Sequence, residues 1–200
     1  PMAWQQGPAM ADLMPDILDY YYKHATPNDA FVNALTGIGY IHEENYAYMY
    51  PPEQRAEIWE EYLHLSRVYR ERLGLTCLTT YHEMTPDKME AFCRLGYRGV
   101  FANYHRSFIT SLHNQVEEVA SVPVFRACNQ ANSVEASVRD IRQWTPKARP
   151  AFVYVSLTNW QTRMEYVQAI ITSLGPEYVP VLPDQLVGLY WQAKESRPAR

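Results

Sequence analysis

Strand-like and helix-like segments alternate along this chain about six times, and this alternation limits the fold more than any other feature. It predicts a parallel sheet covered by helices, because a helix must return the chain between parallel strands. The predicted strands are 2–4, 30–34, 75–80, 99–103, 122–127, 151–157 and 178–182. The predicted helices are 8–23, 51–72, 85–96, 162–174 and 184–194, with another that begins after Ser133.

From this order we expect a single α/β domain over residues 1–194, with a parallel, barrel-like sheet and a frayed tail at 195–200. A glycine-rich phosphate loop, which an open doubly wound sheet often carries, is absent from the sequence. Residues 106–121 are expected to be partly helical. The helix at 8–23 needs a strand before it, so we expect that part of the first strand, or an upstream region, is missing before Pro1.

Composition excludes some function classes and leaves others open. The net charge of −4 and the pI of about 5.9 argue against nucleic-acid binding, which needs a clustered basic surface. No run approaches the ~18 apolar residues of a membrane span. Cys77, Cys93 and Cys128 show no ligand spacing and are interpreted as buried apolar groups. The 16 tyrosines and 5 tryptophans fit either a core or a surface that stacks on sugars.

Active sites of parallel α/β folds lie at the carboxyl ends of the strands, so the residues that follow each predicted strand are the candidates. Aromatic rings there would form a platform for a sugar ring, while asparagine and arginine side chains would hold its hydroxyl groups. The predicted substrate-binding residues are Trp4, Gln5, Tyr40, His42, Tyr81, His82, Asn103, His105, Arg126, Asn129, Asn159 and Trp160.

Four carboxylates are candidate catalytic groups: Glu43, Glu44, Glu83 and Asp184. Glycoside hydrolysis commonly uses two carboxyl groups about 5–10 Å apart. Glu43 or Glu44 would form such a pair with Glu83 if their strands are neighbours. Structural roles are the alternative, because 42–44 could be a solvated charged loop and both Glu83 and Asp184 could cap helices.

Two other functions remain open at the level of sequence. Metal-assisted deacetylation could use His42, His82, His105 and Asp184, but no HxxxH or HExxH spacing supports a metal, and no residue is assigned as a ligand. The other possibility is a non-catalytic domain that binds glycans or acts as a scaffold.

Several short segments, in this order and spacing, carry a family resemblance: AWQQGP at 3–8, LMP at 13–15, YYY at 20–22, TPND at 26–29, GIGY at 37–40, RPAFVYV at 149–155, LGPEYV at 174–179 and LPDQL at 182–186. Together they resemble the carboxyl-terminal domain of the GxGYxYP putative glycoside hydrolases. One departure concerns the motif itself, because His42 and Glu43 stand where the motif has Tyr-Pro.

The resemblance implies a barrel-like α/β fold similar to that of polysaccharide deacetylases, within a larger and often exported bacterial protein that has an upstream region. It assigns no catalytic residues. Combined with the strand-end residues, it favours hydrolysis of glycosidic bonds in a poly- or oligosaccharide, with no cofactor required.

Overall fold

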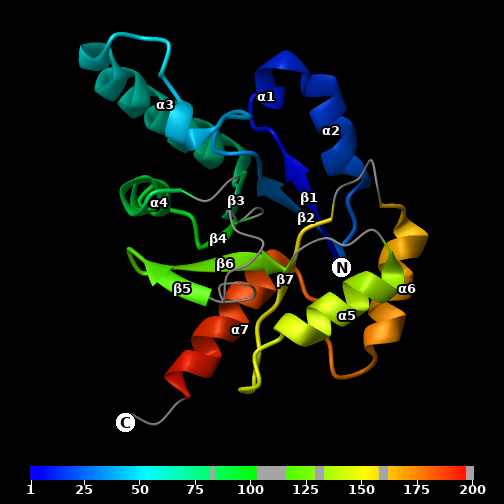
Figure 1. Ribbon diagram of the computed structural model, residues 1–200. Helices are drawn as coiled ribbons and strands as arrows, with labels where there is room; N and C mark the ends of the chain where they lie inside the picture. The colour runs from blue at the N-terminus through cyan, green and yellow to red at the C-terminus, as the bar shows by residue number, and fades with distance from the viewer. Residues whose placement is uncertain (82–83, 103–115, 129–132, 158–161, 197–200) are drawn as a thin grey trace.

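The computed structural model describes residues 1–81, 84–102, 116–128, 133–157 and 162–196. Its centre is a seven-stranded sheet in the order β1-β2-β3-β4-β6-β5, with β7 also paired to β6 (Figure 1). Every pairing within the described ranges is parallel except that of β5 with β6. The strands are β1 Met2–Gln6, β2 Asp29–Asn33, β3 Cys77–Thr80, β4 Gly99–Ala102, β5 Val116–Val119, β6 Val122–Cys128 and β7 Tyr154–Val155.

Over the part of the chain that the structure describes, this sheet is open. β1 pairs only with β2, and the outer side of β6 is shared by β5 along its first half and β7 along its second half. The parallel order confirms the predicted α/β class. The predicted barrel is not confirmed, because closure needs hydrogen bonds between the two edge strands and none of the described pairings joins β1 to β5 or β7.

Helices cover both faces of the sheet, which is why the short central strands β3 and β4 are buried along their whole length. On one face, α3 and α4 bring Tyr62 and Phe92 onto Leu78 and Val100. On the other face, α7 packs Val187 against aromatic residues of β4 and β6. The helices are α1 Met10–Leu13, α2 Pro15–His24, α3 Pro52–Leu73, α4 Pro86–Cys93, α5 Val134–Trp144, α6 Met164–Leu174 and α7 Pro183–Glu195, with a 3₁₀ turn, η1, at Glu43–Asn45.

Local signals explain several helix boundaries. α3 ends where Gly74 adopts a left-handed conformation, with φ of +63°. Ser133 caps α5 as predicted, and its side chain accepts the N–H of Ala136 at 3.1 Å. The single helix predicted over 8–23 is wrong, because Pro15 has no N–H and begins a second helix instead. No described helix is long and apolar enough to cross a membrane.

Four further predictions differ from the described structure. Residues 151–157 form only the two-residue strand β7, although their apolar side chains pack on both sides. Residues 178–182 do not form a strand. The described part of 106–121 is the antiparallel strand β5 rather than helix. No side chain caps α6, so the capping box predicted at 162–165 is also wrong.

Candidate functional site

A tight turn leads from the carboxyl end of β2 toward the loop before α3. Gly37 lies in this turn with φ of +67°, a conformation that favours glycine. Ser66 of α3 occupies the space beside it, and the Ser66 hydroxyl accepts the N–H of Ile38 at 3.0 Å. A β-carbon on residue 37 would overlap the Ser66 hydroxyl. Both the backbone conformation and the lack of space therefore require glycine at this position.

Tyr62, a residue of α3, holds the same turn through hydrogen bonds of its hydroxyl group. Its hydroxyl donates toward the carbonyl oxygens of Thr36 and Gly39, the latter at 2.8 Å, and lies 3.3 Å from the N–H of Gly39. Burial raises the pKa of Tyr62, so the hydroxyl keeps the proton that it donates. Sequence reasoning did not single out Tyr62 for this role, since helical spacing does not reveal which turn a helix crosses.

Glu43 is the most deeply buried carboxylate of the described residues, with 1% of its surface exposed. One carboxylate oxygen accepts hydrogen bonds from the Thr36 hydroxyl and, at 3.3 Å, from the N–H of Tyr81. The Thr36 hydroxyl also accepts the Tyr81 N–H at 3.1 Å. The other oxygen, Oε2, is buried and has no hydrogen-bond partner in the part of the chain that the structure describes. Glu43 thus joins the turn after β2 to the exit of β3.

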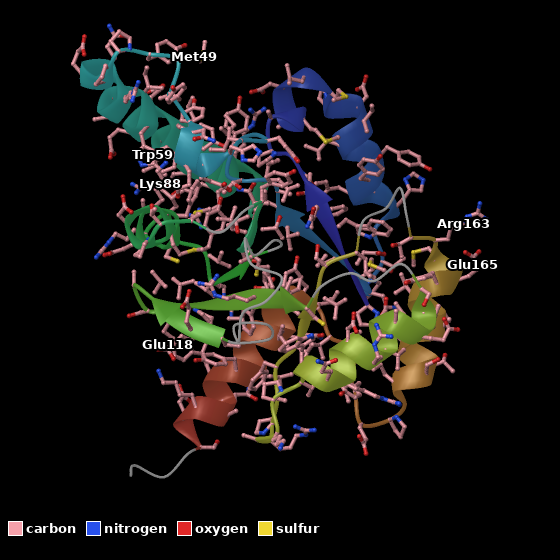
Figure 2. The ribbon with its side chains drawn as sticks, in the orientation of Figure 1. Met49, Trp59, Lys88, Glu118, Arg163 and Glu165 are labelled. Carbon is pink, nitrogen blue, oxygen red and sulfur yellow. The ribbon has the colours of Figure 1, made fainter. Side chains whose placement is uncertain are left out.

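Glu44 follows in η1, and about a quarter of its side chain is exposed. Its Oε1 accepts the N–H of Thr85 at 2.8 Å, and its Oε2 lies 3.9 Å from Nζ of Lys88. Lys88 also donates to the backbone carbonyl of Glu43 and lies 5.1 Å from the centre of the Trp59 ring (Figure 2). Sequence reasoning missed Lys88. The available signal was its place in a helix that starts at the carboxyl end of β3.

Three aromatic rings lie together at the exits of β2 and β3, and one of them belongs to Tyr81, whose N–H donates to Glu43. The centre of the Tyr81 ring is 4.7 Å from that of Tyr40 and 5.1 Å from that of His42. Tyr40 is 63% exposed, and His42 is exposed as well. The structure therefore brings together five of the predicted residues, from the exits of β2 and β3: Tyr40, His42, Glu43, Glu44 and Tyr81.

Three other predicted binding residues lie elsewhere. Trp4 is in the middle of β1, and its indole N–H donates to Asp29 at the amino end of β2, at 2.7 Å. Gln5 is exposed on the same edge strand. Arg126 is near the carboxyl end of β6, but its guanidinium pairs with Glu117 of β5. β1 continues to Gln6, so Trp4 and Gln5 lie within the strand and not at its carboxyl end, where they were predicted.

Asp184 lies near the amino ends of β3 and β4, at the opposite end of the strands from the other candidates. Its carboxylate accepts a hydrogen bond from Thr76 at 2.7 Å and pairs with Arg98 at 3.1 Å, and these two residues precede β3 and β4. The residue follows no strand, since 178–182 is not one, and it lies in the first turn of α7. Asp184 therefore does not join the other candidates, and the structural role considered for it fits its position.

The remaining predicted residues lie outside the described ranges: His82, Glu83, Asn103, His105, Asn129, Asn159 and Trp160. Within those ranges, no three His, Cys, Asp or Glu side chains come together as a metal site would require. All three cysteines are buried, and they form no disulfide bond with one another. Burial raises the pKa of Cys77 and of Cys93 to about 12, so neither thiol supplies a nucleophile near neutral pH.

Hollows on the described surface include one along α5 and one in the loop before α3. The larger, of about 710 Å³, lies along α5 and includes Ser173 at the end of α6, but it holds none of the predicted site residues. Arg142 in its wall already donates to the carbonyl of Ser173 at 2.8 Å. The smaller, of about 210 Å³, is in the loop 41–50 and includes His42. Of these two hollows, only the smaller adjoins the five predicted residues at the carboxyl ends of β2 and β3, which we call the carboxyl edge of the sheet.

A family model described as "GxGYxYP putative glycoside hydrolase C-terminal domain" matches residues 1–191. The chain belongs to this family. The motif in the family's name corresponds to Gly37, Gly39 and Tyr40, the turn that Tyr62 and Ser66 hold against α3. The match confirms the resemblance seen in the sequence.

A solved structure described as a putative hydrolase from Bacteroides thetaiotaomicron VPI-5482 is similar to this chain, with a TM-score of 0.77 and 18% sequence identity. The similarity covers 96% of this chain and 39% of that one, so the chain spans about two fifths of its length. At this identity the likeness shows the fold alone. No curated protein matches the chain. Family and neighbour are both described as hydrolases, and neither description assigns catalytic residues.

Proposed function

We propose that this domain binds a carbohydrate chain at the exits of β2 and β3 and hydrolyses a glycosidic bond there. The observation that carries the proposal is the group of aromatic rings, Tyr40, His42 and Tyr81, beside carboxylates at the carboxyl edge of a parallel sheet. Aromatic faces suit the apolar faces of sugar rings, and this edge is where parallel α/β folds place their chemistry.

Burial supports different roles for the two neighbouring carboxylates. Glu44 is partly exposed and held at one oxygen by the N–H of Thr85, so it is the candidate that can reach a bound sugar. Glu43 is buried and positions the loop. Glu83 remains the proposed partner of Glu44. In such a pair one carboxyl group protonates the leaving oxygen, while the other activates water or attacks the anomeric carbon.

The proposal extends to the longer protein in which such a domain works. The family description places the domain at a carboxyl terminus, and the similar structure is a longer chain. We propose that an upstream region of the same protein is its partner and that a poly- or oligosaccharide is its substrate.

Glu44→Gln and Glu83→Gln test the chemistry. Each is expected to reduce the release of reducing ends from a responsive polysaccharide by ~100-fold or more, the usual size of an acid–base contribution. Glu57→Gln, an exposed position on α3, is the matched control and should keep the wild-type rate. Full activity in Glu44→Gln, with an unchanged melting temperature, would remove Glu44 from the mechanism.

A non-catalytic glycan-binding domain is the second candidate function. The observation that favours it is that both oxygens of Glu44 already have neighbours in the protein, while Glu43 is buried. Binding to a glycan array without turnover would support this function, and measured turnover would exclude it. Metal-assisted deacetylation has less support since Asp184 lies at the other edge, and metal analysis of the purified protein tests it.

A further inference from the structure

The loop between η1 and α3 has a defined backbone path. Consecutive turns link the N–H of Asn45 to the carbonyl of His42, that of Tyr48 to Asn45, and that of Tyr50 to Ala47, each at 3.0 Å. Ala47 is buried and has φ of +64°, an uncommon conformation for a residue with a side chain. Such a residue persists only where its surroundings fix it, and strained positions of this kind gather at functional sites.

Arg55 of α3 holds the tip of this loop. Its Nε donates to the carbonyl of Tyr50 at 2.8 Å, and its Nη2 donates to the carbonyl of Tyr48 at 3.0 Å. The guanidinium carbon also lies 5.4 Å from the centre of the Tyr48 ring. One side chain therefore fixes both the backbone of the tip and the position of an exposed aromatic ring.

The tip presents unusually apolar side chains to solvent. Tyr48 is 67% exposed, Met49 90% and Tyr50 51%. Met49 lies at the outer end of the projection that this loop forms with the start of α3 (Figure 2). Together with Ile41, His42, Asn45, Tyr46 and Ala47, these residues line the hollow of about 210 Å³. A hollow with aromatic walls and an amide side chain has the composition of a sugar-binding site.

We propose that this hollow is a second sugar subsite, one unit along from the rings of Tyr40 and Tyr81, and that Arg55 is the positioning residue that keeps it formed. The proposal rests on the proposed carbohydrate function. His42 belongs to both places, since it lines the hollow and its ring contacts that of Tyr81. The substrate class is therefore an oligosaccharide of two or more pyranose units that spans both sides of His42.

A rigid subsite contributes affinity because its ordering is completed before the ligand binds. Isothermal titration of the full chain with glucan, xylan and chitin oligosaccharides of one to four units is the test. For the ligand that binds best, we expect affinity to rise about tenfold or more from one unit to two, which corresponds to ~1.4 kcal/mol. Tyr48→Ala and Arg55→Met should abolish this rise and leave the affinity for one unit within about twofold.

Two controls separate positioning from loss of structure. Tyr48→Phe keeps the ring and should keep the rise. Arg67→Met removes an exposed arginine of the same helix and should behave as the wild type in binding and in melting temperature. Because Tyr48 is exposed, Tyr48→Ala remains informative even if Arg55→Met lowers the melting temperature.

The outcomes also separate this proposal from the one on which it rests. If Tyr40→Ala abolishes binding while Tyr48→Ala and Arg55→Met keep the dependence on ligand length, the subsite is excluded and the carbohydrate site stands. If the wild-type chain binds no oligosaccharide, both proposals fall.

Discussion

Carboxylates lie at the carboxyl edge of the sheet and also along α7, and their hydrogen-bond and ion-pair partners differ between the two regions. On the α7 side, Asp184 pairs with Arg98, and Glu118 pairs with Lys194 at 2.6 Å and accepts the Tyr190 hydroxyl at 2.7 Å. At the carboxyl ends of β2 and β3, no cation of the described residues bonds to the Glu43 side chain, and its Oε2 is unpartnered among those residues.

The difference indicates what each region is for. A partly exposed, paired carboxylate contributes modestly to stability and needs no further explanation. A buried carboxylate with an unused oxygen is costly to the folded state, so its presence points to a role beyond folding. Glu43 holds the loop that carries the aromatic rings and Glu44. The contrast therefore separates groups that support the fold from groups that shape the proposed site.

The largest expected effect comes from adding one methyl group at each region. Gly37→Ala should lower the free energy of unfolding by about 3 kcal/mol, because the new β-carbon overlaps Ser66 and φ is positive. Gly99→Ala should lower it by about 2 kcal/mol through overlap with Val187 of α7. Urea unfolding measures both.

Glycan binding gives a second comparison of Gly37→Ala with Gly99→Ala. Gly37→Ala should also abolish glycan binding under conditions where the chain stays folded, whereas Gly99→Ala should keep it. Equal binding by the two variants would contradict the assignment of the Gly37 turn to the site.

Removing a threonine hydroxyl sharpens the same contrast at a smaller scale. Thr36→Val should lower the free energy of unfolding by about 2 kcal/mol, because a buried carboxylate oxygen and the N–H of Tyr81 lose a partner. Thr76→Val should change it by only about 0.5 kcal/mol, since Asp184 keeps Arg98 and contact with water. Urea unfolding measures both free energies. Similar losses of stability in the two variants would show that the carboxylates of the two regions depend equally on their threonine partners.

The smallest effect concerns pH and the α7 side. Hydrogen bonds from Lys194 and Tyr190 hold the pKa of Glu118 below its ordinary value of 4.5. Because the folded-state pKa lies below the unfolded one, the charged carboxylate stabilises the protein above about pH 4.5. This contribution to stability is lost as the pH falls through the folded-state pKa. Glu118→Gln should therefore be less stable by about 0.5 kcal/mol at pH 7 and equal to the wild type in strong acid. A constant difference from pH 7 to pH 2 would contradict this linkage.

Sequence patterns predicted elements well where local chemistry decides them. The helix predicted at 51–72 is α3 Pro52–Leu73, bounded by proline and glycine, and Ser133 caps α5 as expected. The patterns failed where pairing with a distant strand decides whether a segment forms an element. Residues 151–157 have the composition of a buried strand, yet only Tyr154 and Val155 pair with β6, because β5 occupies the other half of that edge.

The candidate site was predicted in part. Counting residues beyond β2 and β3 placed Tyr40, His42, Glu43, Glu44 and Tyr81 in one region, because the carboxyl ends of neighbouring parallel strands meet. The same rule misplaced Asp184, since it relied on a strand at 178–182 that does not form.

The sequence by itself determined the family, the α/β order and the group of residues after β2 and β3, because these depend on periodicity, turn chemistry and short motifs along the chain. The tertiary structure alone decided that the sheet is open in its described part, that Glu43 is buried while Glu44 is partly exposed, and that Arg55 donates to the backbone of the loop that follows His42. These properties depend on which distant segments pack together, and linear spacing carries little information about that.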